Sequence, residues 1–173
     1  GKWTVDEIPA DRLVGPAVVI DVRTSAARDP DYRLTPADVL TWEERHGRIA
    51  PGMIVLLRTG WGARWPERKR YFGDDTPGRT TALHFPSYGR EAATLLVGER
   101  HVRAIGVDTA SIDYGPSADF PVHQIVSAAD VAGLENVAHL EELPETGAWV
   151  VALPMKIGGG SGGPLRIVGL VPR

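Results

Sequence analysis

The sequence contains no cysteine, which excludes disulfide bonds, thiolate metal ligands and cysteine nucleophiles. It has no apolar run close to the roughly 20 residues that a membrane helix needs, and no signal peptide is visible. A net charge of −3 gives no electrostatic reason to expect nucleic acid or an anionic membrane surface as a partner. These absences suit a cytoplasmic protein.

What is present is typical of one soluble domain. The 173 residues are 43% hydrophobic and 24% charged, which is enough for a real core and short for two domains. Apolar, β-branched runs predict strands in residues 17–22, 52–60, 102–109, 147–157 and 165–171. These strands alternate with predicted helices, so we expect an α/β domain with a mixed sheet.

The helices are predicted from caps and from apolar spacing. Thr35 and Pro36 mark the start of a helix that Gly47 ends. Apolar residues recur at helical spacing in residues 87–97 and 134–144. Residues 61–81 show no periodicity and are expected to form one long loop, a length that is often functional in a compact domain.

Three of the predicted strands end on polar side chains. They are Asp21, the pair Arg58 and Thr59, and the pair Asp108 and Thr109. In α/β sheets the carboxyl ends of the strands are where ligands gather. These three strand ends are therefore a fold-level pointer to a ligand site.

The stretch "DFPVHQIVSAADVAGLEN" places one histidine, His123, and one glutamate, Glu135, among apolar neighbours. Twelve residues of continuous helix turn by about 120°, so the two side chains would not share a face. They converge only if the chain breaks between them, and Gly133 offers that break. The apolar neighbours predict a buried His123. The pair indicates either two metal ligands or a buried polar pair, and spacing alone leaves both open.

Several stretches occur in the order found in the metal-dependent cyclase family. They include "RLVGPAVVIDV", "IAPGMIVLLRTGW", "VRAIGVDTASID" and "FPVHQIVSAADVAGLENVAHLEELP". The sequence resembles this family, which includes bacterial kynurenine formamidases and isatin hydrolases, over nearly its whole length from about Asp6. The resemblance implies that residues 1–173 form one compact α/β domain of the swivelling β/β/α, cyclase-like type, assembled as a homodimer or homotetramer.

The resemblance also implies chemistry. It predicts one or two divalent metal ions, zinc or manganese, and a small ring-containing substrate whose amide, formamide or lactone carbonyl is hydrolysed. His123 and Glu135 stand at the spacing of two of the family's metal ligands. Trp61 and Phe85 are candidates for substrate contact, with ordinary packing as the alternative for both.

One departure from the family is clear. The family's signature, H-x-G-T-H-x-D-x-P-x-H, supplies further metal ligands and a catalytic histidine, and it does not occur in these 173 residues. We therefore assign no catalytic residue in this chain and expect those residues upstream, with this chain as the C-terminal portion of a longer protein or beside a separate N-terminal segment. The alternative is a non-catalytic binding or assembly module that kept the fold and lost its metal site.

Overall fold

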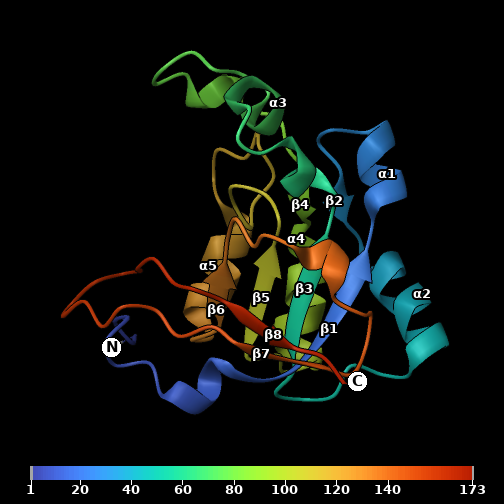
Figure 1. Ribbon diagram of the computed structural model, residues 1–173, viewed down its shortest axis with the longest axis vertical. Coiled ribbons are helices and arrows are strands. Elements are labelled where there is room, and N and C mark those ends of the chain that lie inside the picture. Colours follow the sequence, from blue (N-terminus) through green and yellow to red (C-terminus); the bar gives the residue numbers. More distant parts are fainter. Residues whose placement is uncertain (1, 173) are drawn as a thin grey trace.

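The computed structural model describes residues 2–172 and has a six-stranded mixed sheet at its centre (Figure 1). The strand order is β6-β5-β3-β1-β7-β8. Four neighbouring strands run parallel, namely β1 (Val14–Asp21), β3 (Ile54–Arg58), β5 (Ala104–Val107) and β6 (Ala132–Leu134). β7 (Ala148–Val151) pairs antiparallel with β1, and β8 (Val168–Leu170) pairs antiparallel with β7. The predicted α/β class with a mixed sheet is confirmed.

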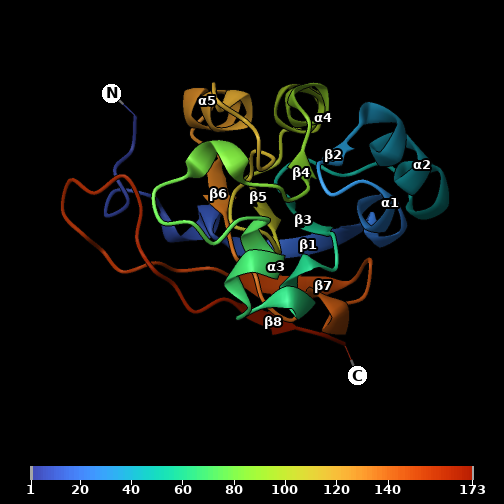
Figure 2. The same cartoon turned by 90° about the horizontal axis from the view of Figure 1, so that it is seen from above.

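Helices cover one face of this sheet. α2 (Pro36–His46), α4 (Arg90–Thr94) and α5 (Pro121–Ala128) lie on the same side of it, as the view from above shows (Figure 2). The other helical segments are α1 (Arg23–Arg28), α3 (Arg68–Phe72), the 3-10 turns η1 (Ala10–Arg12), η2 (Trp61–Arg64), η3 (Thr80–Ala82) and η5 (Leu140–Glu142), and the π-helical turn η4 (Leu95–Glu99). A small parallel sheet joins β2 (Arg33–Leu34) to β4 (Ser87–Tyr88). Within residues 2–172, no helix combines the length and apolarity needed to cross a membrane.

The core lies on both faces of β3, whose five residues are all buried. Val55 and Leu57 face the layer of helices, whereas Ile54 and Leu56 face the opposite side, which β7 and η5 close with Val150 and Leu140. A strand covered on both faces needs apolar residues at every position rather than at alternate ones. This requirement explains the uninterrupted run "IVLL".

The α2 helix begins where its caps predict. The Thr35 hydroxyl accepts a hydrogen bond from the Asp38 amide (3.2 Å), and the Asp38 carboxylate accepts one from the Thr35 amide (2.8 Å). This reciprocal arrangement satisfies two amides that the first helical turn leaves without partners. Pro36 occupies the first helical position, and Gly47 follows the last.

The helix predicted for residues 134–144 is wrong. Leu134 belongs to β6, and only Leu140–Glu142 forms a single 3-10 turn. Asn136 and His139 have φ angles of 55° and 59°, which a continuous helix does not allow. The helical spacing arose because Leu134, Val137 and Leu140 are all buried in the same part of the core.

Two further boundaries differ from the predictions. Residues 61–81 are not one irregular loop, because η2, α3 and η3 lie within them. These segments are too short to show a period, and Trp61 and Tyr71 anchor them in a small core. The predicted helix at residues 87–97 begins only at Arg90, since residues 87 and 88 pair with β2.

Gly106, in the middle of β5, leaves room for side chains of the two neighbouring strands. A Cβ atom there would lie 2.7 Å from Leu56 Cδ2 of β3 and 3.2 Å from Leu134 Cβ of β6. Its carbonyl oxygen accepts a hydrogen bond from the buried Tyr88 hydroxyl (2.8 Å). The side chains of Leu56 and Leu134 therefore fill the space next to Gly106.

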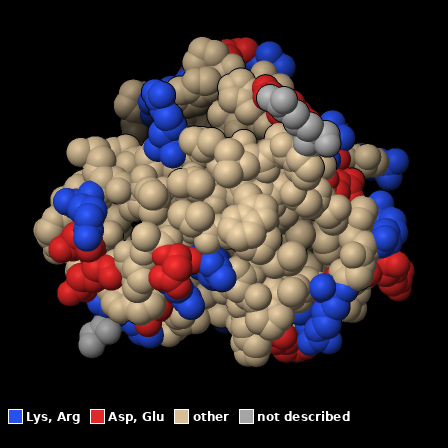
Figure 3. Space-filling model, turned by 60° about the horizontal axis from the view of Figure 1, so that its bottom comes forward, with Lys and Arg blue, Asp and Glu red and all other residues tan. Residues whose placement is uncertain are grey.

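The C-terminal strands leave an apolar surface. In the view that brings the bottom of the molecule forward, the centre of the surface shows few charged side chains (Figure 3). Residues 149–171 carry many exposed large apolar side chains, namely Trp149, Leu153, Met155, Ile157, Leu165, Val168, Leu170 and Val171.

A buried ion pair ties α2 to the turn after α4, and it provides a test of the fold. The Glu43 carboxylate accepts two hydrogen bonds from the Arg100 guanidinium (2.8 and 2.9 Å), and the Arg100 side chain is only 4% exposed. Glu43→Gln should lower the free energy of unfolding by about 1–3 kcal/mol at pH 7, because the buried Arg100 would keep only the exposed Glu99 (3.2 Å) as a charged partner. Urea unfolding measures this change.

The same variant should show a characteristic pH dependence. The hydrogen bonds from Arg100 hold the pKa of Glu43 below its usual 4.5. The stabilisation is therefore complete above about pH 4.5 and is lost as the pH falls through the lower folded-state pKa. The stability difference between the wild type and Glu43→Gln should shrink on acidification, whereas the exposed neighbour variant Glu44→Gln should match the wild type throughout. A difference that stays constant down to pH 3 would contradict the assignment.

Candidate metal site

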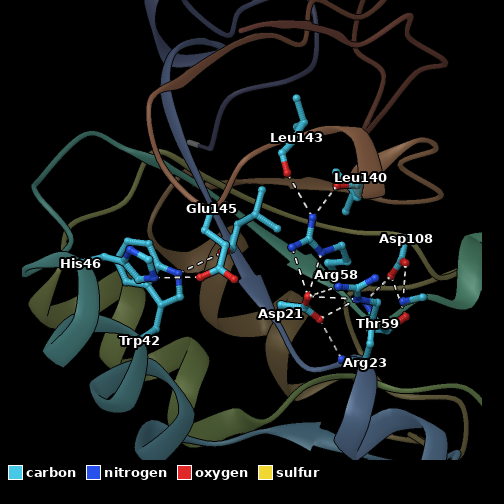
Figure 4. Close-up of polar contacts among 12 residues, drawn as sticks. Asp21, Arg23, Trp42, His46, Arg58, Thr59, Asp108, Leu140, Leu143 and Glu145 are labelled. Atoms are coloured by element: carbon cyan, nitrogen blue, oxygen red, sulfur yellow. Dashed lines mark hydrogen bonds and ion pairs between the residues drawn. The ribbon is translucent and has the colours of Figure 1, made fainter. Parts of the chain in front are cut away.

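The polar strand ends meet at one edge of the sheet, where they satisfy one another (Figure 4). Arg58 donates to Asp21 (3.2 Å) and to the carbonyl oxygens of Leu140 and Leu143 (3.1 and 3.0 Å). Burial alone would raise the pKa of Asp21, but hydrogen bonds from Arg23 and the charge of Arg58 hold it below its usual value. This part of the edge is a structural network that fixes the chain after β1 and β3.

Asp108 completes that network at the end of β5. Its carboxylate accepts hydrogen bonds from the Thr59 hydroxyl (2.6 Å), the Thr59 amide (2.9 Å) and the Gly60 amide (2.8 Å). Burial raises the pKa of Asp108 above its usual value, although these donors oppose the shift. The contacts join the end of β3 to the end of β5 and so position the chain that continues toward Asp113.

His123 and Glu135 do come together. The chain leaves α5 after Ala128, reverses through Asp130 (φ 52°) and enters β6, so that Glu135 lies directly after this strand. The Nε2 atom of His123 is 3.3 Å from Oε1 of Glu135. The predicted break in the helix is therefore present, but it lies before Gly133, which is part of β6.

Asp113, which the sequence analysis did not single out, holds His123 in place. Its side chain is 1% exposed, and one carboxylate oxygen lies 2.7 Å from Nδ1 of His123. The same carboxylate accepts hydrogen bonds from the backbone amides of Val122 (2.9 Å) and His123 (3.1 Å). Asp113 thus satisfies the first amides of α5 and orients the imidazole ring, leaving Nε2 to face Glu135.

These contacts determine the charge of the imidazole. The hydrogen bond to Asp113, followed by that to Glu135, raises the pKa of His123 to about 9. The His123 side chain is 43% exposed, so the prediction of a buried histidine is wrong. Only one side of α5 packs against the core, through Val122 and Val126, and His123 lies beside that packed side. Glu135 is fixed by the Ile112 amide, which donates to its Oε1 atom (3.1 Å).

The two side chains fit part of a coordination set for a divalent cation. Imidazole nitrogen and carboxylate oxygen are both common zinc ligands, and they also suit manganese. A carboxylate on the second ring nitrogen, as Asp113 provides here, is the usual support of a metal-binding histidine. A cation at Nε2 has to displace the proton that the raised pKa favours. Two donors remain fewer than the three protein ligands of a catalytic zinc.

A groove of about 630 Å³ adjoins this pair. Its walls come from three segments, which are the N-terminal residues between Lys2 and Leu13, the stretch from Val126 to Val137 that contains β6, and the C-terminal stretch between Ala152 and Ile167. His123 and Glu135 both line it.

Trp61 and Phe85 do not line this groove. Both are buried, at 2% and 3% exposure, in a small aromatic cluster with Tyr71. The cluster reaches the site indirectly, because the Tyr71 hydroxyl donates to the side-chain oxygen of Asn136 (2.9 Å), the residue after Glu135. Their role in substrate contact stays a prediction.

A second group of possible ligands lies elsewhere. His139, Glu141 and Glu142 are all exposed, and their ligand atoms lie within 4.8 Å of one another. Exposed groups of this kind are common on protein surfaces, and within residues 2–172 no buried carboxylate supports His139 as Asp113 supports His123.

The fold agrees with comparisons to known proteins. Residues 1–114 match the family model described as "Putative cyclase", so the chain belongs to this cyclase family. It is 33% identical over 172 residues to an isatin hydrolase of Roseibium aggregatum, covering 97% of this chain and 64% of that protein. It is 28% identical over 169 residues to a kynurenine formamidase of Salinibacter ruber, covering 94% of this chain and 66% of that protein.

Solved structures show the same fold. An isatin hydrolase A from Labrenzia aggregata, bound to benzyl benzoate, superimposes with a TM-score of 0.89 at 40% identity, covering 97% of this chain and 65% of that one. An isatin hydrolase bound to the product analogue thioisatinate gives 0.91 at 32% identity, covering 98% and 64%. These matches confirm the expected cyclase-like fold, and they show that the chain spans a little under two thirds of the length of the isatin hydrolases.

Asp113→Asn tests how the histidine is held. Loss of the buried charge should lower the free energy of unfolding by about 1–3 kcal/mol, because three close contacts are weakened. It should also move the pKa of His123 in the metal-free protein from about 9 back toward 6.5. NMR titration of the ring nitrogens measures the pKa directly.

The matched control is Asp119→Asn, on the same loop, whose side chain is 70% exposed. It should leave both the stability and the His123 titration unchanged. If the pKa of His123 is the same in Asp113→Asn as in the wild type, the carboxylate does not set the charge of the ring.

Proposed function

We propose that the protein is part of a metal-dependent hydrolase that cleaves an amide, formamide or lactone bond in a small ring-containing substrate. The observation that carries this proposal is the convergence of His123 Nε2 and Glu135 Oε1 at 3.3 Å, with Nδ1 held by the buried Asp113. Two relatives named isatin hydrolase and kynurenine formamidase support the class of reaction. A further solved structure, 25% identical with a TM-score of 0.66, is described as a potential metal-dependent hydrolase with cyclase activity.

In this proposal His123 and Glu135 hold a divalent ion, zinc or manganese. When bound, such an ion polarises a carbonyl oxygen and lowers the pKa of water. Asp113 keeps the imidazole in one orientation, and the Ile112 amide does the same for Glu135. The remaining ligands and the catalytic histidine of the family signature are expected outside these 173 residues. We place the active protein in the cytoplasm as a homodimer or homotetramer.

A substrate with an aromatic or unsaturated ring needs an apolar wall beside the ion. Trp61 and Phe85 are the candidates proposed from the sequence, and their buried cluster gives them a packing role at least. Through Tyr71 and Asn136 this cluster supports the chain at Glu135, so substitutions in it would affect the site even without direct substrate contact.

A second candidate function has one observation in its favour. A separation of 3.3 Å between Nε2 and Oε1 also suits a direct ion pair between a protonated His123 and Glu135. In a non-catalytic binding or assembly module this pair would simply join α5 to the end of β6. Metal binding separates the two functions, because only the hydrolase needs a cation at these atoms.

His123→Ala should reduce the affinity for zinc and manganese by at least about tenfold, because it removes one of two ligands. Glu135→Gln should do the same while thermal unfolding changes little, since it replaces charge and keeps volume. Calorimetry on metal-free protein and elemental analysis after dialysis measure the binding. If the assembled protein hydrolyses an arylformamide or a cyclic amide, that activity should fall together with the metal affinity in both variants.

Two control variants sharpen the result. His84→Ala removes a half-exposed histidine that pairs with Asp31 outside the groove, and it should leave metal affinity unchanged. His139→Ala tests the exposed group formed with Glu141 and Glu142, and it should also leave metal affinity unchanged. Unchanged metal affinity in His123→Ala, or a loss confined to His139→Ala, would rule out His123 and Glu135 as ligands.

A further inference from the structure

We propose that the side-chain amide of Asn136 binds a carbonyl oxygen of the substrate through its Nδ2 atom, and that the buried Tyr71 hydroxyl holds this amide in position. Asn136 directly follows Glu135 and lines the same groove as Glu135 and His123. The inference rests on the proposed function. It adds to the candidate metal site a residue that recognises the neutral substrate rather than the ion.

The backbone of Asn136 is held by the chain that follows β5. Its amide donates to the Thr109 carbonyl (2.8 Å), and the next amide, that of Val137, donates to the Val107 carbonyl (3.0 Å). Asn136 has a φ angle of 55°, a left-handed conformation that asparagine adopts more readily than most residues. The conformation explains why asparagine is tolerated here, and the side-chain contacts indicate what its amide does.

One end of the side-chain amide is tied to the buried aromatic cluster. The Tyr71 hydroxyl donates to Oδ1 of Asn136 (2.9 Å), and Tyr71 is itself 2% exposed and accepts a hydrogen bond from the Trp61 indole on its backbone carbonyl (2.9 Å). Burial, together with the charges of Asp108 and Glu135, raises the pKa of the Tyr71 hydroxyl above its usual 10. The hydroxyl therefore keeps its proton and remains a donor to Oδ1.

The other end of the amide has no protein partner. Asn136 is exposed, and among residues 2–172 no group accepts a hydrogen bond from its Nδ2 atom. The oxygen and nitrogen of a side-chain amide point in different directions from one planar carbon atom. Holding Oδ1 toward the buried hydroxyl therefore turns Nδ2 away from it. The result is an oriented pair of N–H donors on a residue that lines the groove.

The charges of the site favour a neutral acceptor for these donors. Two carboxylates, those of Asp113 and Glu135, accompany one imidazole, that of His123, so their net charge is negative whether or not the ring is protonated. This charge disfavours an anion, and N–H donors do not bind a cation. The carbonyl of an amide, formamide or lactone is neutral and accepts hydrogen bonds, which matches both conditions.

The composition of the chain provides a simple test by NMR. Asn136 is the only asparagine in the sequence and Gln124 is the only glutamine, so the metal-free protein gives two side-chain NH₂ pairs. Gln124 does not line the groove and donates to the Asp119 carbonyl, which makes its pair the internal reference. The probes are 1-methyl-2-indolinone, which has a carbonyl and no N–H, and 1-methylindoline, which lacks the carbonyl. Only the first probe should shift the Asn136 pair, and neither should shift that of Gln124.

Three variants separate the donor from its anchor. Asn136→Asp keeps an acceptor for Tyr71 and suits the left-handed conformation, but it removes Nδ2 and should weaken binding of 1-methyl-2-indolinone by about three- to tenfold. Tyr71→Phe keeps the ring, releases Oδ1 and should weaken binding by about threefold. The matched control Tyr32→Phe removes a hydroxyl that bonds to Asp38 (2.8 Å) and should bind like the wild type. The backbone amide of Val137 reports binding in every variant.

Binding of 1-methylindoline should be the same in all four proteins, because it lacks the group that the amide recognises. Equal responses of the Asn136 pair to both probes, or none to either, would overturn the inference. A Tyr71→Phe variant that binds 1-methyl-2-indolinone like the wild type would remove Tyr71 as the anchor, and one that loses both probes equally would show only a packing role.

Urea unfolding checks that each variant folds, and the comparison of the two probes on the wild type decides the role of Asn136 if Tyr71→Phe does not fold. The titration uses neither metal nor turnover. Its failure is therefore distinguishable from failure of the proposed function, which the metal affinities of His123→Ala and Glu135→Gln test separately.

Discussion

The pairing of β3 with β1 on one side and β5 on the other is the constraint on which the rest of the structure depends. Because β3 is buried on both faces, it orders helices on one side and β7 with η5 on the other. The parallel ladder also brings the ends of β1, β3 and β5 to one edge. There Asp21, Arg58 and Asp108 fix the departing chains, including the one that carries Asp113. The position of His123 follows from that chain.

The pattern of strands was predictable from the sequence, because it rests on local information. The convergence of His123 with Glu135 was expected from the resemblance to the cyclase family, since their spacing alone left two interpretations open. Continuous apolar runs such as "IVLL" indicate buried strands, and Thr35 with Pro36 marks a helix start. The true structure of residues 134–144 was not predictable in this way. Leu134, Val137 and Leu140 are buried by separate contacts, which gives the same spacing as one face of a helix. A one-dimensional pattern does not distinguish the two.

Asp113 shows a second limit of sequence reasoning. It lies ten residues before His123, in the quoted stretch "VRAIGVDTASID", at a spacing that matches no metal-binding motif. Its role depends on three contacts at 2.7 to 3.1 Å, which exist only after α5 has packed beside the end of β5. A buried acidic residue close to the start of a helix was the available signal. It does not by itself identify which histidine the carboxylate supports.

The missing side chain of Gly106 has a consequence at a distance. Leu56 and Leu134 occupy the space where its Cβ atom would lie, so this glycine leaves room for side chains of β3 and β6 above β5. Glu135 follows β6 directly, whereas His123 belongs to a helix anchored by Asp113. A methyl group at position 106 would press against the Leu134 side chain, one residue before Glu135. The packing of the strand that leads to Glu135 therefore depends on a residue that contacts neither His123 nor Glu135.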